Sequence, residues 1–172
     1  ETQLNIIKDI LLSLPESSYP TDDYLIAAFK AHGERLNARL IAMILNQKGI
    51  KTKFLDPHEA GLTVTGEPND AIVSPETYLN LDKIKIDSDE HIIFPGFFGI
   101  TPSGHIATFS RGGSDITGAI LAKGLHADLY ENFTDVNGIF AANPAIIDHP
   151  QSIRTMTYRE MRELSYAGFS VF

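Results

Sequence analysis

The first part of the chain is dominated by hydrophobic positions at helical spacing. Residues 2–14 repeat apolar side chains every three or four positions, which predicts a helix. A second helical pattern runs over residues 22–48, with Thr21 as a suitable N-cap and Gly49 as a suitable stop. The positions expected to face the core in this longer helix are Leu25, Ala28, Phe29, Leu36, Leu40 and Ile44. We interpret this stripe as core rather than as a subunit contact.

Short apolar runs between turn residues predict strands in the middle of the chain. Residues 51–56 are expected to form a strand, and the apolar run within residues 90–99 suits a buried strand that ends at Pro95–Gly96. Residues 97–110 are expected to form a hairpin. Weaker patterns predict a short strand at 62–66 and a short helix at 74–84. This part of the chain is therefore expected to contain most of a sheet.

Helices and strands also alternate in the last third. A helix is predicted over 114–125, with Ser114 as its cap, and a strand over 127–136 that runs into a loop. Thr157 and Glu160 form a capping box for a final helix ending near residue 168. The order of these elements indicates a layered α/β domain.

Composition narrows the possible functions. The chain of 172 residues is 43% hydrophobic, as in an ordinary globular domain, and it has no apolar run long enough to span a membrane. A net charge of −8 disfavours binding to nucleic acid. The absence of cysteine excludes thiolate chemistry and fits a cytoplasmic protein. The six histidines are scattered, so no metal site is predicted.

The stretch FSRGGSDITG, residues 109–118, is the first candidate site. A glycine-rich turn that enters a helix exposes backbone N–H groups, and the helix dipole favours an anion there. Arg111 is suited to bind a carboxylate. The alternative is a plain turn at Gly112–Gly113, with Ser114 capping the helix and Asp115 complementing its dipole. The pattern alone leaves both interpretations open.

Two further stretches are weaker candidates. Thr134 and Asp135 follow the end of a predicted strand, where ligands gather in α/β sheets, although an Asn-Gly turn at 137–138 explains the same stretch. Gly33 lies inside the long predicted helix, where glycine costs about 1 kcal/mol relative to alanine. It therefore needs a reason, and Glu34 and Arg35 beside it are either functional or a solvated pair.

Taken together, these segments resemble one family. The motifs HGERL, PGFFG, RGGSD and NFTDVNGI occur in the order found in aspartokinases of the amino acid kinase superfamily. The resemblance covers most of residues 20–172, and the segment DLYENFTDV and the ending GFSVF are similar to the stand-alone aspartokinases of Gram-positive bacteria. It implies a three-layer αβα sandwich with a mainly parallel central sheet, of which the chain is expected to hold one partial catalytic domain.

The resemblance implies ATP-dependent phosphorylation of the β-carboxylate of L-aspartate, with Mg²⁺ bound through the nucleotide phosphates. Arg111 would bind a substrate carboxylate and Glu34 the amino group. The remaining implied site residues are Phe97 and Ser114 lining the aspartate site, Gly112 and Gly113 near the transferring phosphoryl group, Asp115 organising that region, and Thr134, Asp135 and Phe140 at the nucleotide. A homo-oligomer of the full-length protein is also implied.

The chain departs from the family pattern mainly in its nucleotide half. Ser110 stands where glycine is usual, Ala145 where many relatives have arginine, and Ser170 where many have lysine. The Lys-Phe-Gly-Gly segment and the regulatory ACT domains of the family are not among these residues, and both ends look cut. We therefore expect a fragment that is inactive on its own.

Two alternatives to an aspartate kinase remain at this point. Another amino acid kinase, acting on glutamate, N-acetylglutamate or a nucleotide monophosphate, would share the fold. Glu34 argues against an N-acetylated substrate, because such a substrate has no ammonium group to pair with a carboxylate. A non-catalytic relative that only binds an amino acid would also fit the altered nucleotide residues.

Overall fold

The computed structural model describes residues 2–110, 112–133, 138–142 and 146–166. Along the chain it divides into two compact units, the first unit (Glu1–Tyr130) and the second unit (Glu131–Phe172). None of the helices in the described ranges is long and apolar enough to cross a membrane.

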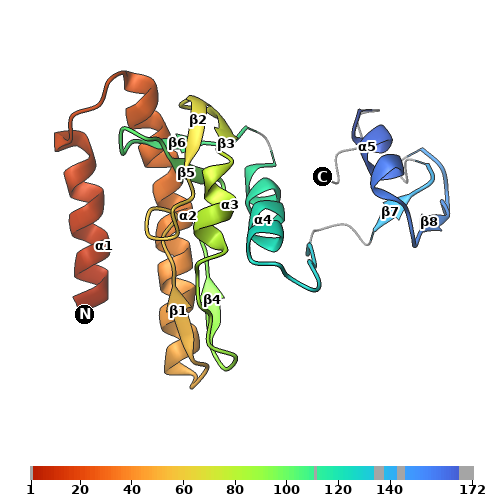
Figure 1. Cartoon of the computed structure of the whole chain (residues 1–172), viewed down its shortest axis with the longest axis horizontal. Helices are drawn as coiled ribbons and strands as arrows, with labels where there is room; N and C mark the ends of the chain where they lie inside the picture. The colour runs from red at the N-terminus through yellow and green to blue at the C-terminus, as the bar shows by residue number, and fades with distance from the viewer. Residues whose placement is uncertain (1, 111, 134–137, 143–145, 167–172) are drawn as a thin grey trace. The chain divides into compact units, whose positions relative to one another are not determined.

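The first unit holds most of the predicted elements (Figure 1). Its helices are α1 (Thr2–Ser13), the 3-10 turn η1 (Leu14–Glu16), α2 (Asp22–Gln47), α3 (Glu76–Leu81) and α4 (Gly113–Gly124). Its strands are β1 (Thr52–Phe54), β2 (Val64–Glu67), β3 (Asp70–Val73), β4 (His91–Ile93), β5 (Phe98–Ile100) and β6 (Ile106–Thr108). The helices predicted over residues 2–14 and 22–48 are therefore confirmed as α1 and α2, and the predicted hairpin as β5–β6. β3 was not predicted.

The strands pair in short sheets of two. β1 and β4 are parallel, with Thr52 opposite His91. The pairs β2–β3 and β5–β6 are antiparallel hairpins, and a parallel bridge joins Thr63 to Ile100. Among the described strands, the parallel character expected from the family fold is thus carried by β1–β4 and this bridge.

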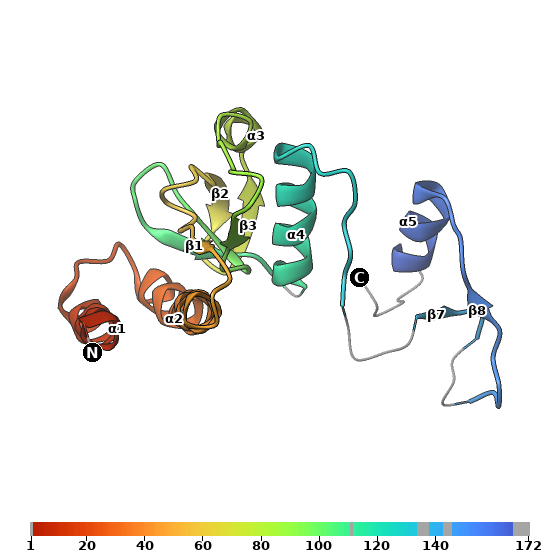
Figure 2. The same cartoon turned by 90° about the horizontal axis from the view of Figure 1, so that it is seen from below.

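Helices cover the strands from two sides (Figure 2). α2 packs against β1, β4 and β6, while α3 and α4 pack against each other and α4 contacts β5. The expected α/β class with three layers is confirmed for the first unit. The closeness of α3 and α4 depends on Gly124, because a Cβ there would overlap the side chain of Leu81.

A compact set of apolar side chains fills the space between the strands and the α3–α4 layer. Its buried members are Leu55, Ala60, Leu62, Val64, Ala71, Leu81, Ala107, Phe109 and Ile120. Burying a leucine or phenylalanine side chain stabilises the fold by about 1.5–3 kcal/mol. Phe109 belongs to this core although it directly precedes the glycine-rich turn, so the turn starts from a fixed point.

The buried face of α2 matches the predicted one only in part. Its buried residues are Ala27, Ala28, Ala31, His32, Ala38 and Ala42. Of the six positions expected in the core, Ala28 is buried and Leu25 and Leu36 are half-buried, but Phe29, Leu40 and Ile44 are each more than a third exposed. The reason is steric, because small side chains let a long helix lie close to the strands while larger ones fit only at the margins.

The helix termini confirm some predictions and correct one. Gly49 ends α2 with a φ of +81°, a conformation that favours glycine. Thr21 occupies the N-cap position of α2, but its side chain makes no capping hydrogen bond. Ser114 is not the cap of α4, because the cap is Gly112 and Ser114 lies within the first turn.

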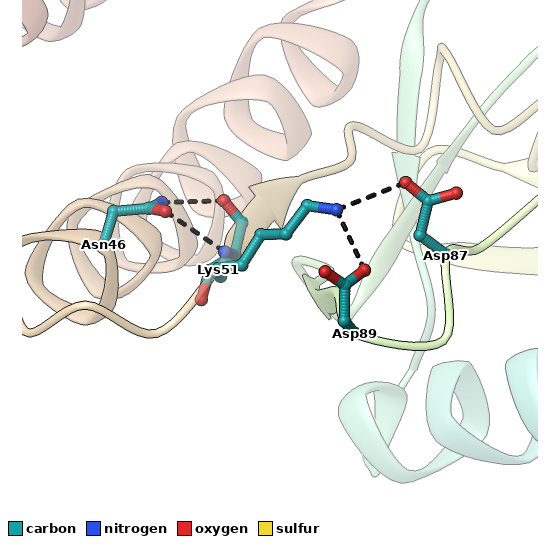
Figure 3. Close-up of polar contacts among 5 residues, drawn as sticks. Asn46, Lys51, Asp87 and Asp89 are labelled. Carbon is teal, nitrogen blue, oxygen red and sulfur yellow. Dashed lines mark hydrogen bonds and ion pairs between the residues drawn. The ribbon is translucent and has the colours of Figure 1, made fainter.

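Polar side chains fix the connection from α2 into β1 (Figure 3). The Asn46 amide donates to the Thr52 carbonyl at 2.7 Å and accepts from the Thr52 N–H at 3.1 Å. The Lys51 ammonium contacts Asp87 at 3.3 Å and Asp89 at 2.9 Å, just before β4. The start of β1 is thereby linked to α2 on one side and to the β4 loop on the other.

The second unit is small and holds β7 (Ile139–Phe140), β8 (Ser152–Ile153) and α5 (Tyr158–Tyr166). β7 and β8 pair antiparallel, which was not predicted because two-residue strands have no readable periodicity. The capping box is confirmed, since the Glu160 carboxylate accepts from Thr157 N at 2.7 Å and Oγ1 at 2.8 Å. These bonds lower the pKa of Glu160. The predicted end near residue 168 lies outside the described residues.

The strand predicted over residues 127–136 is wrong for the residues that the structure describes. Residues 127–133 have no strand structure. Leu129 and Phe133 are 73% and 89% exposed. The apolar pattern resembles a buried strand, but no described strand pairs with this segment, so its backbone lacks the ladder that would make it one. Residues 134–136 are not described.

Candidate functional site

A cleft of about 660 Å³ in the first unit lies at the N-terminus of α4. It is lined by Lys30, Gly33, Glu34, Asn69, Phe97, Thr108, Phe109, Ser110, Gly112, Gly113, Ser114 and Asp115. Six of these residues were predicted from the sequence, namely Glu34, Phe97, Gly112, Gly113, Ser114 and Asp115. The fold thus brings the HGERL, PGFFG and RGGSD motifs to one place, although they are far apart in the sequence.

The start of α4 is built by two glycines with different roles. Gly112 caps the helix in the left-handed region, with a φ of +79° that a residue with a Cβ rarely adopts. Gly113 is buried, and a Cβ there would come within 2.6 Å of the Phe97 ring. Because the cap residue has no side chain to accept from the first-turn N–H groups, this helix end is suited to an anion in the cleft.

Phe97 is held in an unusual backbone conformation at the cleft. Its φ is +81°, a region that costs a residue other than glycine about 1–3 kcal/mol. Its N–H donates to the Thr117 hydroxyl at 3.0 Å, and its carbonyl accepts from the Phe109 N–H at 2.8 Å. The Thr117 hydroxyl in turn donates to the Gly113 carbonyl at 2.9 Å. Strain at a cleft residue that is fixed on both sides is typical of a functional position.

Two carboxylates line the cleft from different elements. Glu34 is on α2 and Asp115 is in the first turn of α4. The pKa of Tyr130 is raised by burial and, to a smaller extent, by the negative charge of Asp115. Tyr130 packs on α4 at Gly118, where a Cβ would overlap its hydroxyl. The two carboxylates give the cleft the capacity to bind an ammonium group.

The side chains of the neighbours Arg35 and Glu34 have different surroundings. Its Nε lies 2.8 Å from Asp56 Oδ2 as an ion pair, and its Nη2 donates to Asp56 Oδ1 at 3.2 Å. The guanidinium also lies 5.0 Å from the centre of the Phe98 ring. Arg35 and Glu34 are therefore not a solvated pair, because Arg35 ties α2 to the residues after β1 while Glu34 lines the cleft.

Several residues of the cleft were not predicted from the sequence, above all Lys30 and Asn69. Lys30 lies four residues before Glu34, a spacing that places both on one face of the helix and that was available as a signal. Asn69 had no such signal, since the β2–β3 turn brings it to the cleft. Gly33 was noted for its cost, and an added Cβ there meets no described atom within 4 Å. It is therefore not a packing requirement.

The remaining predicted site residues are Arg111, Thr134, Asp135 and Phe140. Arg111, Thr134 and Asp135 lie outside the residues that the structure describes. Phe140 belongs to the second unit, where it pairs with Ser152 between β7 and β8. In the described parts of the chain, no three His, Asp or Glu side chains come close enough together to hold a metal ion.

Comparison with known proteins decides the family. The profile of the amino acid kinase family matches residues 2–172, which is nearly the whole chain. The chain belongs to the amino acid kinase family. Similar proteins include Aspartokinase 3 of Bacillus subtilis, which is 53% identical over 166 residues, and an aspartokinase of Geobacillus stearothermophilus, which is 35% identical over 143 residues. These matches cover 96% and 81% of this amino acid kinase chain, but only 36% and 34% of the relatives.

Solved structures agree with this assignment. An aspartate kinase from Clostridium acetobutylicum is 33% identical, with a TM-score of 0.68, over 92% of this chain and 33% of its own. Aspartokinase III from E. coli in complex with aspartate and ADP gives a TM-score of 0.77 over 96% of this chain and 38% of its own. At 23% identity the second likeness shows the fold alone. The chain spans about a third of the length of these relatives, and the family resemblance seen in the sequence is confirmed.

Proposed function

We propose that this chain forms part of an aspartate kinase, which transfers the γ-phosphoryl group of ATP to the β-carboxylate of L-aspartate and yields 4-phospho-L-aspartate. The observation that carries the proposal is the cleft, which combines a carboxylate, Glu34, with the open N-terminus of α4. The 53% identity to an aspartokinase supports it. The product would be the first intermediate on the route to lysine, threonine and methionine.

Within this proposal, the cleft residues position the acceptor. The Glu34 carboxylate pairs with the substrate ammonium, Phe97 and Ser114 line the site, and Arg111 is expected to bind a carboxylate. The nucleophile is itself a carboxylate, so the reaction needs no strong base. Phosphoryl transfer depends mainly on alignment and on stabilising the charge of the transferring group. The α4 N-terminus supplies N–H groups and partial positive charge for that purpose, with Gly112 and Gly113 admitting the phosphoryl group and Asp115 organising the region.

The nucleotide half of the site rests on the family resemblance. Thr134 and Asp135 are expected to contact the nucleotide and Phe140 to lie near its base. Mg²⁺ would neutralise the phosphates when the nucleotide binds. The ion would be held through these phosphates. A homo-oligomer and a cytoplasmic location are part of the same proposal.

A hydroxamate assay tests the reaction, because hydroxylamine traps acyl phosphates. The full-length protein is expected to form aspartyl hydroxamate only when ATP and L-aspartate are both present. The 172-residue chain alone is expected to give only the background signal. Binding of aspartate without ATP turnover by the full-length protein would instead support a non-catalytic relative.

A further inference from the structure

We propose that Lys30 is a second carboxylate-binding residue of the cleft and that Asn69 holds it in place; this rests on the proposed function. Lys30 lies on α2, one helical turn before Glu34, and both line the cleft. An ammonium and a carboxylate presented on one helix face match an amino acid, which carries the opposite pair of charges. Glu34 takes the substrate ammonium, and Lys30 takes a substrate carboxylate.

The charge of the cleft requires a cation of this kind. L-Aspartate carries two carboxylates and one ammonium group, so it enters as an anion. Glu34 already gives the cleft a negative side chain. Among the described residues that line it, Lys30 is the one lysine or arginine. Arg111 is expected to neutralise one substrate carboxylate, and Lys30 would neutralise the other.

The Lys30 ammonium is available for a ligand. Among the described residues it donates to Asn69 Oδ1, at 2.9 Å, whereas an ammonium group can donate three hydrogen bonds. Asn69 is a neutral acceptor, and the ion pairs within the described residues do not include Lys30. The charge is therefore positioned without being neutralised.

The position of Asn69 is fixed from the strands. The carbonyl of Pro68, its neighbour in the β2–β3 turn, accepts from the Thr108 N–H at 2.7 Å and from the Thr108 hydroxyl at 3.3 Å. Thr108 is buried at the end of β6 and also lines the cleft. A chain of contacts thus runs from β6 through the turn to Lys30, and the hydrogen bond to Asn69 holds the ammonium of this exposed residue at the edge of the cleft.

Steady-state kinetics of the full-length protein with Lys30→Met test this assignment. The variant keeps the length of the side chain and removes its charge, so KM for L-aspartate should rise about tenfold, as loss of a charge-assisted hydrogen bond predicts. KM for ATP and kcat should change less than about twofold, because the contact is with the acceptor and is made before and during the reaction. Lys30→Arg should retain most of the affinity, and Asn69→Ala should raise KM for L-aspartate by a smaller factor than Lys30→Met.

Another lysine of the chain, Lys8, provides a matched control. Lys8→Met removes an exposed helical lysine away from the cleft and should leave all constants unchanged. An unchanged KM for L-aspartate in Lys30→Met, or a lower kcat with that KM unchanged, overturns the carboxylate assignment while the proposed function stands. A full-length protein that phosphorylates no amino acid overturns the proposed function, and the role of Lys30 with it.

Discussion

The hydroxyl of Thr117 joins Phe97 to the first turn of α4. It accepts from the Phe97 N–H at 3.0 Å and donates to the Gly113 carbonyl at 2.9 Å. Thr117 is buried and does not line the cleft, yet both residues that it connects do. The shape of the proposed aspartate site therefore depends on a side chain beneath it.

Replacing Thr117 by valine should destabilise this arrangement. The change preserves shape but leaves the Phe97 N–H without its acceptor, a loss worth about 1–3 kcal/mol for a buried group. Urea unfolding should show this decrease, and KM for L-aspartate should rise. Thr117→Ser retains the hydroxyl and serves as the control. Equal effects of valine and serine would show that the hydrogen bonds are unimportant.

Gly33 offers a test in which stability and binding change in opposite directions. Gly33→Ala should raise the free energy of unfolding by about 1 kcal/mol, because alanine is the better helix former and, apart from its chain neighbours and the backbone of α2 itself, no described atom lies within 4 Å of the new Cβ. If the substrate approaches the α2 backbone at this point, the methyl group should raise KM for L-aspartate. Thermal unfolding and kinetics on one preparation check both. A more stable variant with unchanged KM would contradict the approach of substrate.

The Arg35–Asp56 ion pair should contribute more to the free energy of unfolding than the ion pairs of Lys51 with Asp87 and Asp89. The side chains of Arg35 and Asp56 are only 14% and 9% exposed, so Arg35→Met leaves a buried carboxylate without its charged partner, at a cost of about 3 kcal/mol. Lys51 and its partners are exposed, so Lys51→Met should have no measurable effect. Chemical denaturation of both variants checks this contrast, and equal losses would contradict it.

His32 should make stability depend on pH. Burial lowers its pKa below the ordinary value of 6.5; nearby Arg35 and, less strongly, Arg39 add to this, while Asp56 and a hydrogen bond to Ala28 oppose it. The unfolded chain then binds the proton more readily than the folded one, so stability is lost as the pH falls below about 6.5 toward the lower folded pKa. His32→Leu should remove that part of the loss. Urea midpoints at about pH 7.5 and 5.5 compare the two proteins, and an identical decrease in both would exclude His32 as the cause.

The order of several motifs located part of the site where no single motif could. The pattern of the RGGSD turn left two interpretations open and Glu34 was a weak candidate, but the family resemblance assigned both to the site, and the structure places Glu34 in the same cleft as Gly112 and Asp115. Asn69 could not be predicted, because its position depends on the pairing of β2 with β3 and on the bond of Pro68 to Thr108. Tertiary pairing of this kind has no local signature.

Two fold predictions failed for related reasons. Phe29, Leu40 and Ile44 of α2 were expected to be buried, but the helix approaches the strands mainly through its alanines. A prediction based on the spacing of large hydrophobic residues gives alanine too little weight. Residues 127–133 have the composition of a strand and yet form none, since strand structure needs a partner and composition does not reveal one. In both cases the outcome depended on neighbours distant in the sequence.

The most direct test is acceptor selectivity of the full-length protein with ATP. We predict turnover with L-aspartate, a far lower kcat/KM with L-glutamate, and none with N-acetyl-L-glutamate, which lacks the ammonium group that Glu34 would bind. Glu34→Gln should reduce kcat/KM for L-aspartate about a hundredfold, as loss of a charged partner implies. Preferred turnover of N-acetyl-L-glutamate, or an undiminished kcat/KM for L-aspartate in Glu34→Gln, would contradict the assignment of the cleft as an aspartate site.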